Sequence, residues 1–550
     1  MAGKNLVIIP ARGGSKGIPR KNLRPLAGTP LIAYSIRSAL AADHVTRVVV
    51  STDDDEIAMF AERFGASVIR RPDALATDEV PLDPVILHAV EEAEMRWGET
   101  YEHVITVQPT SPFITSADIH RAIAHLEEGN VDTVLSAVDD RHLRWQETSA
   151  GLVPDYAERV NRQQLPLTYK ETGAVIACTR SQLSQGTRIG KRVALIVTDK
   201  DTSIDIDSFQ DLWLCEAILS RKRIAFNVIG RKDIGMGHVY RSLLVASELT
   251  GHDLYFVCNT DDNLAADYIS QQNYRLVVTP KDKIVETLVS LRPDLVINDM
   301  LDTSADFITA LKKAGITTLN FEDLGLGAEV ADAVVNDLYP HQIPSENIFV
   351  GPRYFCLRDE FLFTPPVKHK TNVERMLITF GGVDENNLTC RVINLVAEDL
   401  AARNIQVDII TGPGYPHQDR LRDFLAGSNR GHLNLIEATP RISDYMQKAD
   451  LAITSGGRTV LELASLHVPT VVLCQNHRET THTFASSENG ILNLGLCHDV
   501  SDERLRTTLL RVLDDPKLRS TMSAKAEQMD LRAGKKRVVE IITNLLQKRG

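Results

Sequence analysis

Short apolar runs alternate with helix-length amphipathic segments along the chain, and this alternation limits the fold more than any other feature. In the first part of the sequence, helical periodicity fills the gaps between the runs, as in Leu31–Ala41, Glu56–Phe64 and Pro84–Trp97. The runs themselves have the length of strands: Leu6–Ile9, Arg47–Ser51, His103–Gln108 and Thr133–Val138. This order predicts an α/β fold with a mainly parallel sheet, in which ligands bind at the carboxyl ends of the strands.

The same pattern restarts twice, which predicts more than one domain. A chain of 550 residues is too long for a single hydrophobic core. Ile224–Gly230 is a new apolar strand followed by a glycine-rich turn, and Thr364–Lys370 is a proline-containing break before the strand Met376–Phe380. Both later regions begin with a strand, a glycine turn and a helix, which indicates two similar Rossmann-like lobes facing a cleft. We therefore predict three domains, covering residues 1–223, 224–366 and 367–550.

Charge and cysteine content exclude several classes of protein. The formal net charge is −12, so no basic excess favours binding to nucleic acid. The seven cysteines form no CxxC pair, which argues against a disulfide scaffold or a zinc ribbon and fits a reducing compartment. The first apolar run is too short for a signal peptide, and no run reaches the roughly 18 residues that cross a bilayer. We expect a cytoplasmic protein without a membrane span.

A glycine-rich basic loop, Pro10–Asn22, follows the first strand. Its three glycines and its cations Arg12, Lys16, Arg20 and Lys21 follow neither the GxxxxGK[ST] nor the GxGxxG order. Glycines let backbone N–H groups approach phosphate oxygens, and cations offset the charge of a triphosphate. The plainer interpretation is a solvated basic loop after an edge strand.

Three further polar residues stand in segments where a ligand could bind. Gln108 ends a predicted strand and can both donate and accept hydrogen bonds, as a sugar or a base edge requires. Arg162 carries a guanidinium fork that fits a carboxylate. Arg71 stands in an Arg-Arg-Pro segment, and the alternative interpretation of that segment is a surface turn. For Gln108 the alternative is a turn bounded by prolines.

Two carboxylates alternate with isoleucines in Ser203–Asp207. In a strand, Asp205 and Asp207 would share one face while Ile204 and Ile206 pointed to the core. Two carboxylates beside phosphate groups suit Mg²⁺, whose remaining ligands are water and phosphate oxygens. An ordinary half-buried strand accounts for the alternation equally well.

The order of these segments resembles the acylneuraminate (CMP-sialic acid) synthetase family. The segments are PARGGSKGIPRKNL, RRP, QPTSP, RQ-x-x-P and the Asp-x-Asp of residues 205–207. The resemblance implies a nucleotidyltransferase domain that uses CTP and Mg²⁺ to convert an acidic nine-carbon, sialic-acid-like sugar to its CMP derivative, releasing pyrophosphate. Members of the family are often homodimers, so it also implies a homodimer. No general base is visible in the sequence.

Site residues follow from the resemblance position by position. It implies nucleotide binding by Arg12, Gly13, Gly14, Ser15, Lys16, Lys21, Asn22, Arg71 and Gln108. It implies sugar binding by Gln108, Arg162, Gln163 and Thr172, metal binding by Asp205 and Asp207, and a catalytic part for Arg12, Lys21 and Arg162.

Two departures from the family pattern bear on specificity. Val80-Pro81-Leu82 stands where some members have serines, and Thr172 stands where many have asparagine. Contacts to the base and the preference for the acceptor sugar are therefore expected to differ. Neuraminate, legionaminate and pseudaminate all present a carboxylate and an anomeric hydroxyl, so the acceptor stays open.

The second half of the chain contains its own glycine-rich turns. Gly235–Arg241 follows a predicted strand and places His238 near a helix start, where it could act as a general base near neutral pH. Ser455–Glu462 follows the predicted strand Leu451–Thr454 and opens another helix. A helix cap or surface histidine is the alternative for His238, and a capped core helix is the alternative for the second turn.

Together GMGHxxR, FGG-x-D and SGG-x-T-x-x-E resemble the UDP-sugar hydrolase of pseudaminic-acid synthesis, a GT-B protein with two Rossmann lobes. Asn298–Leu301 and Asn476-His477 depart from that pattern. The alternatives are a glycosyltransferase, a catalytically silent sugar-nucleotide-binding domain and, for the whole chain, a regulatory nucleotide-binding protein. The resemblance implies His238 as the base and UDP binding by Gly237, Ser455, Gly456, Thr459 and Glu462.

Overall fold

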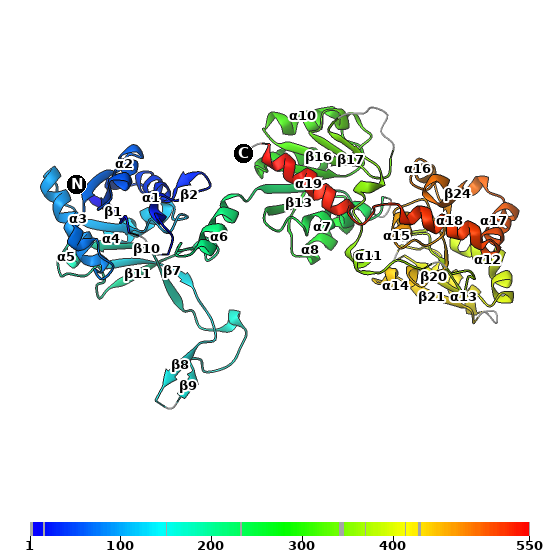
Figure 1. Ribbon diagram of the computed structural model, residues 1–550, viewed down its shortest axis with the longest axis horizontal. Coiled ribbons are helices and arrows are strands. Elements are labelled where there is room, and N and C mark those ends of the chain that lie inside the picture. Colours follow the sequence, from blue (N-terminus) through cyan, green and yellow to red (C-terminus); the bar gives the residue numbers. More distant parts are fainter. Residues whose placement is uncertain are drawn as a thin grey trace. The chain divides into compact units, whose positions relative to one another are not determined.

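The computed structural model describes residues 4–14, 17–149, 151–231, 234–339, 346–368, 370–412, 414–426 and 431–548. The chain forms two compact units, Met1–Arg221 (unit 1) and Lys222–Gly550 (unit 2), each of which can be followed by colour in Figure 1. Both are built from parallel or mainly parallel sheets covered by helices, so the predicted α/β fold class is confirmed. The domain limits drawn from the sequence stay predictions.

Unit 1 is built around a seven-stranded sheet in the order β11-β7-β10-β6-β1-β4-β5, in which only β10 runs antiparallel to its neighbours. The sheet strands are β1 (Asn5–Pro10), β4 (Val45–Thr52), β5 (Ser67–Arg70), β6 (His103–Val107), β7 (Thr133–Asp139), β10 (Tyr169–Thr179) and β11 (Val193–Val197). The helices are α1 (Leu31–Leu40), α2 (Asp55–Arg63), α3 (Leu82–Trp97), α4 (Ser116–Glu127), α5 (Arg180–Leu183) and α6 (Phe209–Leu219).

The central strand β1 shows why both faces of this sheet are covered. Its side chains alternate between two cores, as those of any strand do. Val7 and Ile9 join the core that contains residues of α1, α2 and α4, whereas Leu6 and Ile8 join the core of α3. A strand buried on both sides reads as a continuous apolar run, which is what the sequence has here.

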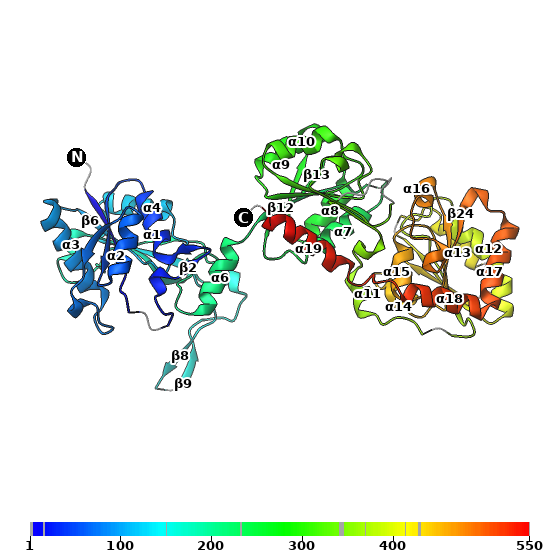
Figure 2. The same ribbon diagram turned by 45° about the horizontal axis from the view of Figure 1, so that its top comes forward.

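Two short hairpins lie outside the main sheet of unit 1. One is formed by β2 (Pro25–Leu26) and β3 (Thr29–Pro30), and the other by β8 (Trp145–Thr148) and β9 (Gly151–Pro154). The β8–β9 hairpin projects away from the sheet in both views (Figures 1 and 2). The segment that contains Arg162 leads from this hairpin back to β10.

The expected strand at Ser203–Asp207 is wrong, because this segment has no strand partner. Its backbone is instead tied to the turn after β6, where Ile206 N–H donates to the Thr110 carbonyl at 2.9 Å. The alternation of environment is nevertheless present. Ile206 is buried in a small core with Ile18 and Leu212, while Asp205 and Asp207 are exposed. The apolar residue therefore anchors the segment without sheet hydrogen bonds.

Unit 2 begins with a lobe of seven parallel strands in the order β14-β13-β12-β15-β16-β17-β18. The strands are β12 (Arg223–Val228), β13 (Asp253–Asn259), β14 (Arg275–Thr279), β15 (Leu295–Asp299), β16 (Thr317–Phe321), β17 (Ala333–Asn336) and β18 (Ile348–Val350). The helices are α7 (Gly237–Ala246), α8 (Asn263–Gln271), α9 (Ile284–Ser290), α10 (Ala305–Lys313) and, after the last strand, α11 (Asp359–Phe363).

The second lobe contains six parallel strands in the order β21-β20-β19-β22-β23-β24. The strands are β19 (Arg375–Ile378), β20 (Gln406–Thr411), β21 (Leu433–Glu437), β22 (Leu451–Thr454), β23 (Thr470–Cys474) and β24 (Ile491–Leu496). The helices are α12 (Leu388–Ala402), α13 (Gln418–Ala426), α14 (Ile442–Met446), α15 (Thr459–Ser465), α16 (His477–Thr480), α17 (Asp502–Asp514), α18 (Pro516–Glu527) and α19 (Gly534–Gln547).

The last helix, α19, returns to the first lobe of unit 2. Val538 and Ile542 are buried in the core that contains Ile224 and Phe226 of β12. Helix α19 lies beside α7 in Figures 1 and 2. The two lobes are thus joined by the chain at two places, the crossover after α11 and the return into α19. Among the described residues, no helix has the length and apolar character needed to cross a membrane.

Candidate active sites

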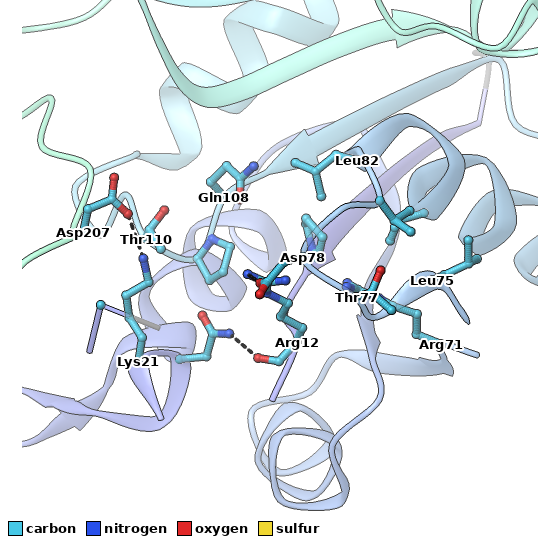
Figure 3. A pocket seen from close by; sticks show the side chains of 16 residues that line it. Arg12, Lys21, Arg71, Leu75, Thr77, Asp78, Leu82, Gln108, Thr110 and Asp207 are labelled. Atoms are coloured by element: carbon cyan, nitrogen blue, oxygen red, sulfur yellow. Dashed lines mark hydrogen bonds and ion pairs between the residues drawn. The ribbon is translucent and has the colours of Figure 1, made fainter. Parts of the chain in front are cut away.

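Unit 1 has a cavity of about 400 Å³ at the carboxyl ends of β1 and β6. Strands β4 and β5 follow β1 on one side, and the chain then crosses to β6 on the other side, so the cavity lies at the point where strand order reverses. Open α/β sheets bind ligands at this point. Figure 3 shows the side chains that line the cavity, among them Arg12, Lys21, Arg71, Gln108 and Asp207.

Two arginines form the cationic centre of this cavity. Arg12 comes from the basic loop, and its Nη2 lies 2.6 Å from Asp78 Oδ1. Arg71 is buried and donates to the Ser51 carbonyl at 2.8 Å. Burial lowers the pKa of Arg71, the Asp53 carboxylate opposes that shift, and the positive charge of Arg12 adds to it. An anion between these guanidinium groups would relieve their repulsion.

Lys21 and Asn22 order the end of the basic loop. Lys21 Nζ donates to the Ile206 carbonyl at 2.8 Å and to Asp207 Oδ1 at 2.9 Å. The Asn22 amide donates to the Arg12 carbonyl at 3.0 Å, and its Oδ1 is buried without a partner among the described residues. The loop is therefore fastened to the segment that contains Asp207, and it brings an unsatisfied acceptor to the cavity wall.

Of the two predicted metal ligands, Asp207 lines the cavity, whereas Asp205 interacts with Asp207 electrostatically and is not among the lining residues. Partial burial raises the pKa of Asp205, a hydrogen bond from Thr110 opposes the shift, and the negative charge of Asp207 adds to it. Two carboxylates that repel each other in this way fit a divalent cation. No cluster of three His, Cys, Asp or Glu side chains that could hold a metal ion occurs in the described part of the chain.

Not every predicted nucleotide-binding residue lines the cavity. Gly13 and Gly14 are not among its lining residues, and the Gly13 N–H donates to Asp53 Oδ1 at 3.1 Å. Ser15 and Lys16 lie outside the described residues.

Of the predicted sugar-binding residues, only Gln108 lines the cavity. Arg162 and Gln163 are exposed on a short 3₁₀ helix, Arg162–Gln164, and do not line the cavity. Thr172 lies in a bulge of β10, with its hydroxyl 2.7 Å from Ser136 Oγ. The same bulge reaches Gln108, whose N–H donates to the Ala174 carbonyl at 2.9 Å. The structure thus connects Thr172 to the cavity through backbone contacts and leaves Arg162 apart from it.

Unit 2 has a cavity of about 480 Å³ lined by both of its lobes. The first lobe contributes Gly237 and Arg241, and the second contributes Arg458, Thr459 and Glu462. Gly237, Thr459 and Glu462 were expected at a UDP site. His238 lies between the lining residues Gly237 and Arg241 in sequence, near the start of α7.

Ser455 and Gly456 do not line this cavity. Gly456 is expected to bind UDP, but its N–H donates to the half-buried carboxylate of Glu479 at 3.1 Å. Glu462 is also engaged, because its Oε1 accepts a hydrogen bond from Arg358 Nε at 2.8 Å. A nucleotide that binds the Gly456 N–H would therefore have to replace Glu479, and one that binds Glu462 would have to replace Arg358.

Residues 6–205 match the family described as Cytidylyltransferase, and residues 376–538 match the Glycosyltransferase family 28 C-terminal domain. The CMP-N,N'-diacetyllegionaminic acid synthase of Campylobacter jejuni is 32% identical over 40% of this chain and 97% of its own length. The chain belongs to the cytidylyltransferase family. The N-acylneuraminate cytidylyltransferase of Escherichia coli is 31% identical over 40% of this chain and 54% of its own length. An uncharacterized protein of Methanocaldococcus jannaschii is 27% identical over 59% of this chain and 66% of its own length.

These matches confirm the resemblance of the first half to the cytidylyltransferases. The chain spans between 46% and 66% of the length of four relatives, among them the Escherichia coli and Methanocaldococcus jannaschii proteins. It spans nearly all of the Campylobacter jejuni enzyme. For the second half, the match supports a GT-B-like glycosyltransferase lobe. It does not show that this half is a UDP-sugar hydrolase.

Sequence reasoning missed part of the wall of the cytidylyltransferase cavity. Leu75, Thr77 and Val80 line it between Arg71 and helix α3, and Val85 lines it from α3 itself. The sequence feature that could have indicated this wall is the apolar run Val80-Pro81-Leu82, which stands in a segment expected to be polar. This wall is suited to covering a flat ring rather than to hydrogen bonding its edge.

Asp78→Asn is expected to lower the KM of the cytidylyltransferase for CTP. In the structure the Asp78 carboxylate lies on Arg12 (Figure 3), so a triphosphate that binds Arg12 must compete with it. Both side chains are partly exposed, which limits the gain to about two- to five-fold. Pyrophosphate release at varied CTP measures it, with exposed Asp73→Asn as control. A higher KM would show that Asp78 helps to hold CTP.

Proposed function

We propose that unit 1 transfers CMP from CTP to a sialic- or legionaminic-type nonulosonic acid and releases pyrophosphate. The observation that supports this most is the cavity at the β1/β6 switch point, which gathers Arg12, Lys21, Arg71, Gln108 and Asp207. Two of the relatives named above are enzymes for a sialic and a legionaminic acid, in agreement with this substrate class.

The chemistry is an in-line displacement. The anomeric hydroxyl of the sugar attacks the α-phosphorus of CTP, its proton passes to solvent, and pyrophosphate leaves. Arg12 and Arg71 would neutralise the triphosphate, while Lys21 holds the segment of Asp207 against the loop. Such positioning and charge compensation supply most of the catalysis in phosphoryl chemistry.

Asp205 and Asp207 would hold Mg²⁺ in this reaction. Bound there, the ion supplies charge neutralisation and a fixed geometry for the phosphate oxygens. Gln108 would bind the sugar or the base edge. The roles of Arg162, Gln163 and Thr172 toward the sugar stay predictions, as does the homodimer.

A pyrophosphate-release assay with CTP, Mg²⁺ and a panel of nonulosonic acids tests the proposal. We expect release with at least one member of the panel and formation of the CMP-sugar in equal amount. Replacing CTP by UTP is the matched control and should give far less release. No release with any sugar of the panel would overturn the assignment.

For unit 2 we propose hydrolysis of a UDP-sugar. The supporting observation is the cavity between two Rossmann-like lobes, which is lined by Gly237 and Arg241 on either side of His238 in the sequence of α7. His238 would take a proton from water, the water oxygen would bond to the anomeric carbon, and the bond from that carbon to UDP would break. The match to a glycosyltransferase family favours a second candidate, transfer of the sugar to an acceptor.

Product analysis separates these functions. The hydrolase releases UDP and free sugar without an acceptor, and His238→Ala should abolish that release. The glycosyltransferase turns over slowly until an acceptor is added. A silent binding domain gives no UDP under either condition, although a nucleotide still binds.

A further inference from the structure

A buried cluster of charged side chains lies beside the cavity of unit 2. It is formed at the carboxyl ends of neighbouring parallel strands, because Asp299 ends β15, Glu322 follows β16 and Asp337 follows β17. All three carboxylates are almost completely buried. Arg241 of α7 lies among them and is itself 1% exposed. Arg241 ends the GMGHxxR segment and Asp299 lies within Asn298–Leu301, but nothing in the sequence brings these two segments together with Glu322 and Asp337.

The Asp299 carboxylate contacts the histidine that would act as the base. His238 Nδ1 lies 2.8 Å from Asp299 Oδ1. Arg241 holds the same carboxylate through both oxygens, with Nη2 at 2.5 Å from Oδ1 and Nε at 2.9 Å from Oδ2. The Ser242 hydroxyl adds a third donor at 3.0 Å. A carboxylate with this many donors has its position and its orientation fixed.

The donors also determine the charge of Asp299. Burial by itself would raise the pKa of this carboxyl, but attraction to Arg241 and hydrogen bonds from Arg241 and His238 hold the pKa below its ordinary value. Asp299 is therefore ionised and can only accept hydrogen bonds. Arg241 Nη2 also lies 3.4 Å from His238 Nδ1. A guanidinium can only donate, so it cannot be the acceptor for a hydrogen on Nδ1, and the acceptor is Asp299. The contact at 2.8 Å hence requires that Nδ1 carries the hydrogen.

Arg241 cannot turn away from Asp299, because its other nitrogen is held as well. Its Nη1 lies 2.6 Å from Glu322 Oε1 and 3.5 Å from Asp337 Oδ1, and its guanidinium lies over the Phe321 ring at 4.6 Å. Burial and the negative charge of Glu322 raise the pKa of Asp337, so one proton stays on this carboxyl pair. Arg458 Nη1, from the second lobe, lies 3.7 Å from each carboxylate.

We propose that Asp299 and Arg241 are positioning residues that hold His238 with hydrogen on Nδ1, so that Nε2 is the proton acceptor of unit 2. The hydrogen position on His238 does not depend on the proposed hydrolase function. Only the role of Nε2 in taking a proton from water rests on that function. The charges around it are balanced, because Asp299 and Glu322 are matched by Arg241 and Arg458. With hydrogen held on Nδ1, the lone pair of Nε2 is the one available to take a proton from an incoming water.

Nitrogen NMR of the full-length protein labelled with ¹⁵N-histidine tests the tautomer without any substrate. The His238 signal is assigned from its loss in His238→Ala. We expect wild-type His238 to carry hydrogen on Nδ1 and none on Nε2 at pH 8. Hydrogen on Nε2 in the wild type would overturn the proposal, and this measurement needs no variant of the buried cluster to fold.

The variant Asp299→Asn should then release the tautomer, because an amide can donate to Nδ1 as well as accept from it. Ser242→Ala is the matched control, since it removes one hydrogen bond to Asp299 and leaves the contact to His238; its tautomer should stay that of the wild type. An unchanged tautomer in a folded Asp299→Asn would contradict the positioning role.

Kinetics separate this inference from the proposed function. If the wild type hydrolyses a UDP-sugar, Asp299→Asn should lower kcat by about 100-fold, the share that a positioned base supplies, and leave the KM for the nucleotide sugar nearly unchanged. A rise in KM with kcat intact would assign Asp299 to substrate binding and overturn the proposal. If the wild type releases no UDP at all, the hydrolase proposal fails while the tautomer experiment still decides the positioning.

Discussion

Asp207→Ala is expected to reduce CMP transfer by about 100- to 1,000-fold, as loss of one preorganised electrostatic contact to a reacting phosphate does. Asp207 lines the cavity of unit 1 and interacts with Asp205, so its removal leaves one of the two carboxylates proposed to hold Mg²⁺. The side chain is 76% exposed, so the free energy of unfolding should change by less than about 0.5 kcal/mol. Pyrophosphate release and thermal unfolding measure the two quantities.

The dependence on Mg²⁺ decides how Asp207 acts. Its other role in the structure is to accept a hydrogen bond from Lys21, which also donates to the Ile206 carbonyl. If Asp207 holds the metal, the variant should need far more Mg²⁺ for half-maximal activity, whereas Lys21→Met should raise the KM for CTP at an unchanged Mg²⁺ requirement. Exposed Asp201→Ala is the matched control. Full activity of Asp207→Ala at low Mg²⁺ would remove this residue from the metal site.

That Arg12 and Gln108 would line one cavity could be predicted from the sequence because they follow strands directly. The loop at Arg12 comes after β1, and Gln108 comes after β6, so both reach the same edge of the sheet whatever the loops between them do. Local pattern and parallel topology are enough for such an inference. The alternation in Ser203–Asp207 exposed both carboxylates as predicted, although the burial of Ile206 and its backbone contacts to Thr110 and Lys21, not a strand, set it.

Contacts that depend on loops and on distant segments could not be predicted. Arg162 lies on a segment leading back from the projecting β8–β9 hairpin, and nothing in its sequence fixes where that segment goes. Gly456 was expected at a UDP site, but its N–H donates to Glu479 from the next helical segment. The cluster around Arg241 joins residues that are 58 and 96 positions away in the chain. Local periodicity contains no information about such pairings.

Gly17→Ala is expected to impair CMP transfer far more than its size suggests. A Cβ at Gly17 would lie 2.5 Å from the backbone carbonyl oxygen of Asp207, a contact that no side-chain rotation can relieve. The loop or the Asp207 segment must therefore shift, and both line the cavity. A displacement of this kind costs about 100-fold in rate, because the reacting groups lose their alignment. The KM for CTP and kcat, measured by pyrophosphate release, should both change.

Gly14→Ala provides the comparison within the same loop. Nothing lies within 4 Å of a Cβ at Gly14, so the protein itself tolerates the change. If packing against Asp207 is what the loop requires, Gly14→Ala should keep nearly wild-type activity and Gly17→Ala should lose it. The opposite order would mean that the phosphate chain approaches the backbone at Gly14, and that the contact between Gly17 and Asp207 can adjust. A loss in both variants with equal unfolding temperatures would place CTP along the whole loop, since each methyl group would then meet the ligand.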